Sequence, residues 1–324
     1  MRSFRHLNAR SVDEAIELLQ KYAGRAVIQG GGTDLLPTLK AGYLSDYPKA
    51  VINIKTIPHL DALETDGPVI RLGAAVKLAQ LIESPFLQER YPVLTEAVRT
   101  VATPQIRNMA TVGGNLCQDI RCWYYRYPAQ LGGPVQCARK GQGPCLAVKG
   151  DNRYHAVMGA KRCFAVCPSD LAVALTALEA RLVICGPRGQ RTVLVEDFFG
   201  DFSTDLIKEE MVLAVEIPGN IQPTIQRFIK FTTRAPIDFA IVSAAAALTV
   251  KNSLCHEARI ALGAVAPGPV RTRKAEDVLK GKALVETAAA EAAEEALKGA
   301  RPLSRNGYKI PLAKTLIQRA ILGS

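Results

Sequence analysis

Apolar residues along the first 60 positions follow two different spacings, helical in one stretch and extended in two others. Ser11 precedes apolar side chains at positions 15, 16, 18 and 19, and Glu14 stands at the distance of a capping box. Short apolar runs at 25–29 and 50–54 have the length of strands. This order predicts βαβ-type architecture for residues 1–60.

Strand and helix patterns continue to the C-terminus. We expect strands at 68–72, 181–185, 191–195, 211–217, 227–232, 248–250 and 259–262, and helices at 77–82, 91–101, 170–177, 272–280, 285–297 and 308–322. The apolar run 239–250 is the longest, and its length suits a buried core helix rather than a membrane span. We therefore expect a helix or a buried segment at 238–246. A Pro-Gly-Asn turn at 218–220 marks a domain boundary.

The periodicity is lost between about residues 117 and 162, where glycine, proline, tyrosine and basic residues dominate. A loop of this length inside a compact domain is usually functional or disordered. Six of the eight cysteines lie at or just beyond it: Cys117, Cys122, Cys137, Cys145, Cys163 and Cys167. We expect these cysteines, rather than secondary structure, to hold the segment.

The composition is that of an ordinary globular protein. The chain has 324 residues, of which 48% are hydrophobic and 22% charged, which excludes wholesale disorder, collagen and a bare disulfide scaffold. Asp13 and Glu14 stand where a signal peptide would need its apolar stretch, so we expect a cytoplasmic protein without a membrane span. In a reducing compartment, cysteines are more often metal-binding, catalytic or simply buried than disulfide-bonded.

The net charge of +11 is concentrated in the cysteine-rich part of the chain. Residues 121–162 carry eight basic side chains and one acidic one, a local excess of +7. A solvated basic loop and a site for an anionic partner or group are both compatible with this excess. Basic side chains would also stabilise the negative charge of an iron–sulfur cluster held by thiolates.

Two glycine turns, at 30–34 and 111–115, are the clearest candidates for ligand binding. Glycines let the backbone approach a ligand closely, and successive N–H groups can cradle phosphate oxygens. Neither turn matches the standard dinucleotide or Walker fingerprint. No cysteine interval is C-x2-C, so spacing alone leaves an iron–sulfur site, a zinc site and buried cysteines open. No nucleophile–base arrangement is recognisable, and we assign no catalytic residue.

Taken together and in order, six motifs resemble the FAD-binding medium subunits of the xanthine oxidase family of molybdenum hydroxylases. They are Gln29-Gly-Gly-Gly-Thr-Asp34, Asn53-Ile-Lys-Thr-Ile-Pro58, Gln105-Ile-Arg-Asn108, Thr111-Val-Gly-Gly-Asn115, Ile260-Ala-Leu-Gly-Ala-Val-Ala-Pro267 and Val270-Arg-Thr-Arg273. The resemblance covers about residues 4–322. It implies an α+β chain with a two-subdomain FAD-binding fold of the vanillyl-alcohol-oxidase type, followed by an α+β C-terminal domain.

The same resemblance implies boundaries and binding residues. The FAD-binding domain would span 1–219, with subdomains at about 1–60 and 61–219 and a cysteine-rich insertion at about 117–167, and the C-terminal domain 220–324. The backbone of the glycine turns would bind the pyrophosphate, Thr33, Asn115 and Asp119 would contribute side chains, and Lys230 would approach the flavin ring. The implied cofactor residues are Gln29, Gly30, Gly31, Gly32, Thr33, Asp34, Thr111, Gly113, Gly114, Asn115, Asp119 and Lys230.

The cysteine insertion narrows the resemblance to the β subunits of 4-hydroxybenzoyl-CoA reductases, which carry an extra 4Fe–4S cluster. Carried over position by position, the ligands are Cys122, Cys137, Cys145 and Cys163. Cys167 competes as the fourth ligand. The loop 146–162 is longer than in that enzyme, so the substrate stays open.

By this resemblance the chain is an electron-transfer subunit of an oxidoreductase. Substrate turnover would belong to a large molybdenum-cofactor subunit, two 2Fe–2S clusters to a small subunit, and the assembly would be an (αβγ)2 heterohexamer. Ferredoxin or another carrier would exchange electrons with it, and no nucleic acid would be bound. Four alternatives remain open: the FAD subunit of another aromatic or N-heterocycle hydroxylase, a stand-alone NAD-dependent flavoprotein, a zinc- and nucleic-acid-binding protein, and a protein with an interaction role only.

Overall fold

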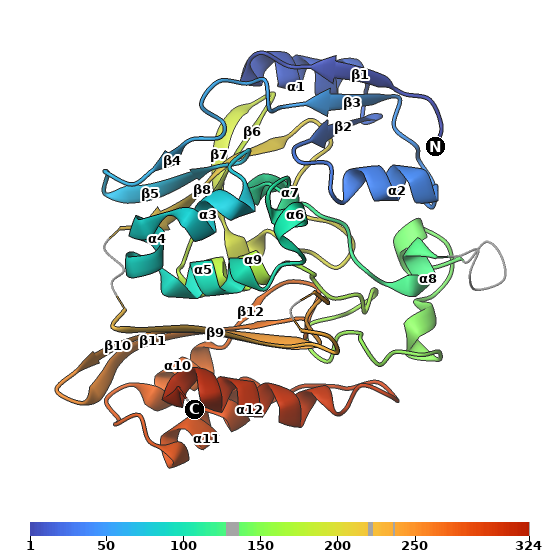
Figure 1. The fold of residues 1–324 in the computed structure, drawn as a ribbon. Coiled ribbons are helices and arrows are strands. Elements are labelled where there is room, and N and C mark those ends of the chain that lie inside the picture. The colour runs from blue at the N-terminus through green and yellow to red at the C-terminus, as the bar shows by residue number, and fades with distance from the viewer. Residues whose placement is uncertain (128–135, 220–222, 236, 324) are drawn as a thin grey trace.

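A small parallel sheet forms the N-terminal end of the computed structural model, which describes residues 1–127, 136–219, 223–235 and 237–323 (Figure 1). Its strands have the order β1-β3-β2, and the elements are β1 (Arg5–Asn8), α1 (Val12–Lys21), β2 (Ala26–Gln29), α2 (Leu35–Ala41) and β3 (Ala50–Asn53). The predicted βαβ architecture is confirmed. Ser11 caps α1, its Oγ accepting from the Glu14 N–H at 3.1 Å, while the Glu14 carboxylate accepts from the Arg10 N–H.

An antiparallel five-stranded sheet follows, with the order β4-β5-β8-β6-β7. Its strands are β4 (Leu63–Glu64), β5 (Val69–Gly73), β6 (Arg181–Gly186), β7 (Gly189–Leu194) and β8 (Met211–Pro218). The helices that belong to this part of the chain are α3 (Leu78–Glu83), α4 (Pro85–Arg90), α5 (Pro92–Arg99), α6 (Pro104–Arg107), α7 (Val112–Leu116) and α9 (Asp170–Ala177). The strands predicted at 181–185 and 191–195 are confirmed, and they pair as the β6–β7 hairpin. The expected glycine turn at 111–115 is instead the start of α7, because Thr111 caps it and its Oγ accepts from the Gly114 N–H at 3.1 Å.

A third, four-stranded antiparallel sheet lies between two groups of helices (Figure 1). Its strands are β9 (Ile225–Phe231), β10 (Val242–Lys251), β11 (Leu254–Gly263) and β12 (Val270–Arg271). Helices α10 (Arg273–Leu279), α11 (Glu286–Ala296) and α12 (Lys309–Leu322) pack on one side, and α5 and α9 on the other. One apolar core lies between this sheet and the C-terminal helices, and a second core joins the preceding sheets.

The helix prediction for residues 238–246 is wrong, although the burial expected for much of that segment is present. Residues 242–251 form β10, the strand hydrogen-bonded to both β9 and β11. Four consecutive alanines, at 244–247, favour a helix by intrinsic propensity. Here both backbone edges of the strand are paired and both of its faces are covered, so tertiary context overrides that propensity.

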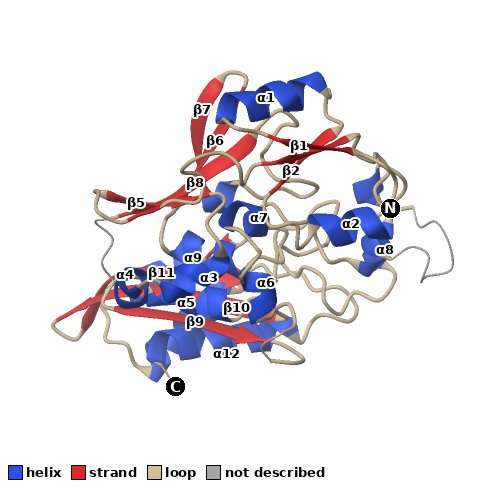
Figure 2. Ribbon diagram, turned by 45° about the horizontal axis from the view of Figure 1, so that its top comes forward, coloured by secondary structure: helices blue, strands red, loops and turns tan. Residues whose placement is uncertain are grey.

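The cysteine segment, residues 117–167, contains few regular elements, as expected. In its described part the structure shows α8 (Trp123–Arg126) and two single 3₁₀ turns, η2 (Ala138–Lys140) and η3 (Leu146–Val148). Helix α8 lies beside α2 in both views (Figures 1 and 2). The ring of Tyr125 packs edge-on against that of Tyr43, with centroids 5.1 Å apart, so the segment docks on the N-terminal part of the chain.

The far end of the segment is held by the loop that precedes α12. The Asn152 Oδ1 accepts from the Arg305 N–H at 2.8 Å, and the buried Asn306 Nδ2 donates to the carbonyls of His155 and Ala156 at 3.1 Å each. The buried Lys309 Nζ donates to the carbonyls of His155, at 3.1 Å, and of Ala264. Side chains near the C-terminus therefore supply hydrogen-bond donors to the buried backbone carbonyls of a loop that has little secondary structure of its own.

Across the ranges that the structure describes, no helix combines the length and the hydropathy needed to cross a membrane.

We expect Asn306→Ala to lower the free energy of unfolding by about 2–4 kcal/mol, because the Ala156 carbonyl loses its donor and the His155 carbonyl loses one of its two donors. The Leu303 N–H, which donates to Asn306 Oδ1 at 2.6 Å, loses its acceptor as well. Denaturant unfolding of both proteins measures the difference. Gln142→Ala, at an exposed position of the same segment, is the control and should change stability by no more than about 0.5 kcal/mol. Equal stabilities would show that this loop does not depend on Asn306.

Candidate functional site

The first glycine turn lies against Thr111 and against the backbone that leads into the second turn. A Cβ at Gly31 would lie 1.8 Å from the carbonyl oxygen of Met109, and one at Gly30 would lie 2.5 Å from Thr111 Oγ1. Gly32 has a φ of +74°, in the left-handed region that favours glycine. Side chains at 30 and 31 would therefore push the turns apart, and glycine there keeps two stretches of backbone side by side.

A cavity of about 460 Å³ opens beside these turns and extends to β9. Ten of the twelve residues that the resemblance implies line it: Gly30, Gly31, Gly32, Thr33, Asp34, Thr111, Gly114, Asn115, Asp119 and Lys230. Gln29 and Gly113 do not line it. Gln29 ends β2, and Gly113 is buried with its Cβ position 3.0 Å from the Cβ of Ala74. The fold thus brings together groups separated by about 200 positions in sequence.

The Asp34 carboxylate fixes one wall of the cavity. Its Oδ2 accepts from the Asp119 N–H at 2.8 Å, and its Oδ1 lies 2.8 Å from both the Arg126 and the Arg121 guanidinium groups. Arg126 is buried and also donates to the Ile120 carbonyl. The first glycine turn is therefore tied to the chain that enters the cysteine segment, and the Asp34 side chain has a positional role.

The far end of the cavity holds a buried ion pair between β9 and α9. Lys230 Nζ lies 2.7 Å from the Asp170 carboxylate, and the two side chains are only 4% and 6% exposed. Lys230 also donates to the Thr100 carbonyl at 2.8 Å. Burial raises the pKa of Asp170, and the Lys230 charge opposes that shift. The sequence singled out Lys230, but no local signal identified Asp170 as its partner.

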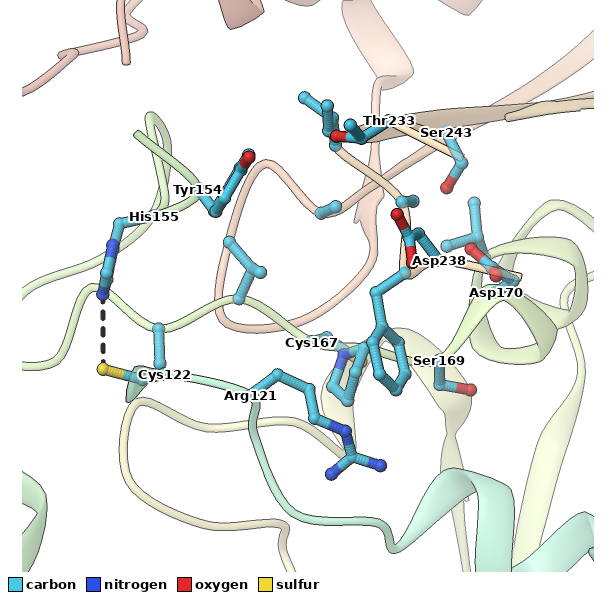
Figure 3. Close-up of a pocket in the computed structure, with 18 of the residues that line it drawn as sticks. Arg121, Cys122, Tyr154, His155, Cys167, Ser169, Asp170, Thr233, Asp238 and Ser243 are labelled. Carbon is cyan, nitrogen blue, oxygen red and sulfur yellow. Dashed lines mark hydrogen bonds between the residues drawn. The ribbon is translucent and has the colours of Figure 1, made fainter. Parts of the chain in front are cut away.

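A second cavity, of about 250 Å³, adjoins the first and leads toward the cysteine segment (Figure 3). The two cavities share five lining residues: Arg121, Pro168, Asp170, Asp238 and Phe239. The Arg121 guanidinium stacks over the Phe239 ring at 4.6 Å from its centroid. Asp170 stands at one end and Cys122 at the other, so a continuous set of side chains joins the ion pair to the first predicted metal ligand.

Two of the predicted metal ligands, Cys137 and Cys145, affect the pKa of a third, Cys163. Burial raises the pKa of Cys163, and the charges of Cys145 and Cys137 act in the same direction. Burial likewise raises the pKa of Cys122 to about 12, with contributions from Cys163 and Cys145. Each of the four thiols is thus linked to at least one other by its effect on a pKa. As they stand, no three His, Cys, Asp or Glu side chains of the described chain are grouped as a metal would require.

Cys117 and Cys167 lie apart from that group. Burial raises the pKa of Cys167 to about 12, and the one charged side chain acting on it is Asp170, not a cysteine. Cys117 lines the first cavity beside the second glycine turn. Cys185 and Cys255 are buried in strands, as small core residues are. The charges that act on each thiol thus distinguish Cys163 from Cys167, whereas their spacing in the sequence does not.

Two consecutive parts of the chain match known protein families. Residues 2–220 match the FAD binding domain in molybdopterin dehydrogenase, and residues 227–324 match the CO dehydrogenase flavoprotein C-terminal domain. The Escherichia coli K12 aldehyde oxidoreductase FAD-binding subunit PaoB is 32% identical, over 97% of this chain and 96% of that protein. The carbon monoxide dehydrogenase medium chain of Hydrogenophaga pseudoflava is 28% identical, over 98% and 96%.

Solved structures agree with these matches. Carbon monoxide dehydrogenase from Hydrogenophaga pseudoflava superposes with a TM-score of 0.78 at 27% identity, covering 99% of this chain and 96% of that one. Quinoline 2-oxidoreductase from Pseudomonas putida 86 gives a TM-score of 0.77 at 27% identity, with the same coverage. The expected α+β fold, a FAD-binding domain followed by an α+β C-terminal domain, is confirmed.

Two substitutions test whether the paired glycine turns hold the flavin. Gly31→Val should separate the turns, and Gly114→Val should project a side chain into the cavity that Gly114 lines. We expect both to weaken flavin retention more than tenfold, a loss of at least about 1.4 kcal/mol in binding free energy. The flavin content of the purified protein, read from its absorbance, measures the effect.

Gly67→Ala is the matched control for these variants, because the nearest atom to a Cβ there is 3.5 Å away. It should retain flavin like the unsubstituted chain. Normal flavin content in both valine variants would show that the paired turns do not form the binding site.

Proposed function

The chain belongs to the family of FAD-binding medium subunits of molybdenum-containing hydroxylases and dehydrogenases, and on that premise we propose that it relays electrons within such a complex through FAD and a 4Fe–4S cluster. Bound FAD exchanges two electrons together or one at a time, and iron–sulfur clusters exchange one. The residues of this chain position the groups and set their surroundings.

The observation that carries the FAD site is the cavity with the glycine turns at one end and the Lys230–Asp170 pair at the other. An elongated dinucleotide has a charged pyrophosphate and a polar-edged ring, so it needs both kinds of contact. The backbone N–H groups of the first turn suit the pyrophosphate. Those of residues 112–115 already donate within the chain, so the second turn lines the cavity without offering a free backbone N–H. The buried Lys230–Asp170 pair suits the ring edge, where a fixed charge tunes the flavin.

Side chains near the turns complete the proposed contacts. The Asn115 Oδ1 accepts from Ser169 Oγ at 2.6 Å, which leaves the amide Nδ2 without a partner among the described residues and free to donate to a ligand. Thr33 and Asp119 line the same cavity. The Asp119 carboxylate already accepts from the Ile120 N–H at 2.8 Å, so we assign it a supporting position at the edge of the nucleotide.

We propose Cys122, Cys137, Cys145 and Cys163 as the cluster ligands, and the chemistry of this donor set supports the assignment. Cys137 and Cys163 are buried, and the charges of Cys145 and Cys137 act on Cys163. Arg139 lowers the pKa of Cys163 against the effect of burial, which favours the thiolate that binds iron. No cysteine charge affects the pKa of Cys167, and this difference favours Cys163 as the fourth ligand.

The placement of the two proposed centres favours transfer between them. The second cavity has Asp170, beside the proposed ring position, and Cys122 among its lining residues. One continuous wall therefore joins the flavin end to the cluster end. The cluster would give the subunit a one-electron port in addition to the flavin.

We propose that the partners are a large molybdenum-cofactor subunit and a small 2Fe–2S subunit, in an (αβγ)2 heterohexamer. Ferredoxin or another carrier would exchange electrons at the cluster. Substrate would be turned over on the large subunit, and 4-hydroxybenzoyl-CoA reductase is the complex that the cysteine motif favours. The relatives include an aldehyde oxidoreductase, a carbon monoxide dehydrogenase and a nicotine 6-hydroxylase, so other substrates of the family are the alternative.

We also propose the domain division 1–219 and 220–324, which the family matches at 2–220 and 227–324 support. Both matches are to flavoprotein domains of this family, which favours the electron-transfer role over a zinc- and nucleic-acid-binding protein.

Cofactor analysis of the full chain, purified anaerobically, tests the relay. We expect about one FAD, four iron and four sulfide per chain, with a reduced-cluster EPR signal after dithionite. Cys122→Ser and Cys163→Ser should each bring iron to near zero and keep FAD, since the proposed flavin contacts lie on other residues. FAD without iron in the unsubstituted chain would retain the flavin site and contradict the cluster.

Cys167→Ser is the matched control for these variants. It lies four residues from Cys163 and is equally buried, so it should keep its iron. Loss of iron in Cys167→Ser together with normal iron in Cys163→Ser would reverse the assignment of the fourth ligand.

A further inference from the structure

The imidazole of His155 lies against the sulfur of Cys122. Its Nε2 is 3.3 Å from Cys122 Sγ, within hydrogen-bond distance for sulfur (Figure 3). The side chain is 3% exposed, and its other ring nitrogen, Nδ1, is buried without a hydrogen-bond partner among the described residues. Of the two ring nitrogens, Nε2 is thus the one with a polar neighbour.

This contact fixes which nitrogen carries the proton. A proton can sit on Nε2 in the neutral ring as well as in the charged one, and only at Nε2 does the structure show a polar neighbour among the described residues. An N–H on Nδ1 would have no acceptor, whereas one on Nε2 points at sulfur. When a metal binds, the cysteine loses its proton and the sulfur can only accept.

The position of the imidazole is built into the fold. The His155 carbonyl accepts from Asn306 Nδ2 and Lys309 Nζ, both at 3.1 Å, so the backbone at 155 is anchored independently of its side chain. Trp123 packs edge-on against the ring at a centroid distance of 5.5 Å, and Tyr124 lies at 6.1 Å. The donor is therefore held in place by groups that are not cluster ligands.

We propose that His155 is a positioning residue that donates its Nε2–H to the Cys122 sulfur and thereby raises the reduction potential of the cluster. The inference rests on the proposed function, since it needs Cys122 to be a cluster ligand. Hydrogen bonds to ligating sulfurs stabilise the more negative, reduced state of a cluster. A buried N–H is effective here because the surrounding medium screens it weakly.

Two substitutions of His155 distinguish the effect of its N–H donor from the effect of its side-chain shape. His155→Phe removes the donor and keeps a ring in the aromatic surroundings, whereas His155→Gln keeps an N–H donor. Midpoint potentials are measured by EPR-monitored redox titration of the full chain, with the flavin potential as an internal reference. We expect a lower cluster potential in His155→Phe, a value closer to that of the unsubstituted chain in His155→Gln, and an unchanged flavin potential.

Trp123→Phe is the control, because it alters the packing of the ring and leaves the donor in place. It should leave the cluster potential unchanged. Loss of the cluster in His155→Phe but not in His155→Gln would also support the inference, as rescue by a donor.

An unchanged cluster potential in His155→Phe would overturn the inference and leave the proposed cluster intact. Loss of the cluster from both variants would overturn it as well, since side-chain shape rather than the N–H would then matter. A chain that never holds iron would instead contradict the cluster assignment itself, and the inference with it.

Discussion

The Asp34 carboxylate is the contact on which both proposed centres depend. It stands at the end of the first glycine turn, and its three partners, the Asp119 N–H, Arg121 and Arg126, belong to the chain that enters the cysteine segment. A partly buried carboxylate of this kind must keep its donors, because an unpaired buried charge costs several kcal/mol. The requirement fixes the glycine turn and the segment relative to each other. The proposed nucleotide site and the proposed cluster loop are thus parts of one polar network.

The basic excess of the cysteine segment has a structural explanation in part. Arg121 and Arg126 face Asp34, Arg153 pairs with Asp151 at 2.5 Å, and Arg139 lies 3.9 Å from Asp119. Of these, Arg139 also acts on the Cys163 thiol, where its charge opposes the effect of burial on the pKa. A solvated loop would leave its charges facing water. Here Arg121, Arg126 and Arg139 are mostly buried and face carboxylates, whereas the Arg153 side chain is 54% exposed. The inward charges stabilise buried negative groups.

Local patterns in the sequence were sufficient for most elements and for the first glycine turn, whereas the second expected turn is the start of α7. Ser11 caps its helix where predicted, α9 forms where a helix was expected at 170–177, and the strands expected at 181–185 and 191–195 pair as a hairpin. Contacts between distant residues were not predictable in this way. Asp170 pairs with Lys230 across 60 positions, and β10 is a strand because sheet neighbours and helices surround it. His155 is a similar case, since its role depends on Cys122, 33 positions earlier, and on Asn306 near the C-terminus.

The stretch from Cys163 to Asp170 shows how chain connectivity couples the two proposed centres. Cys163 packs with Ile120 and Ala165 in a small apolar cluster that Cys122 also contacts. Cys167 lies beyond it, where its N–H donates to the Ala266 carbonyl at 3.1 Å, and Asp170 then begins α9 beside Lys230. Seven residues, an extended length of at most about 25 Å, thus join a proposed cluster ligand to the acid beside the proposed flavin ring. Because both ends of this stretch are buried, neither proposed centre can move far without the other. The covalent chain therefore limits the distance between them, in addition to the packing around them.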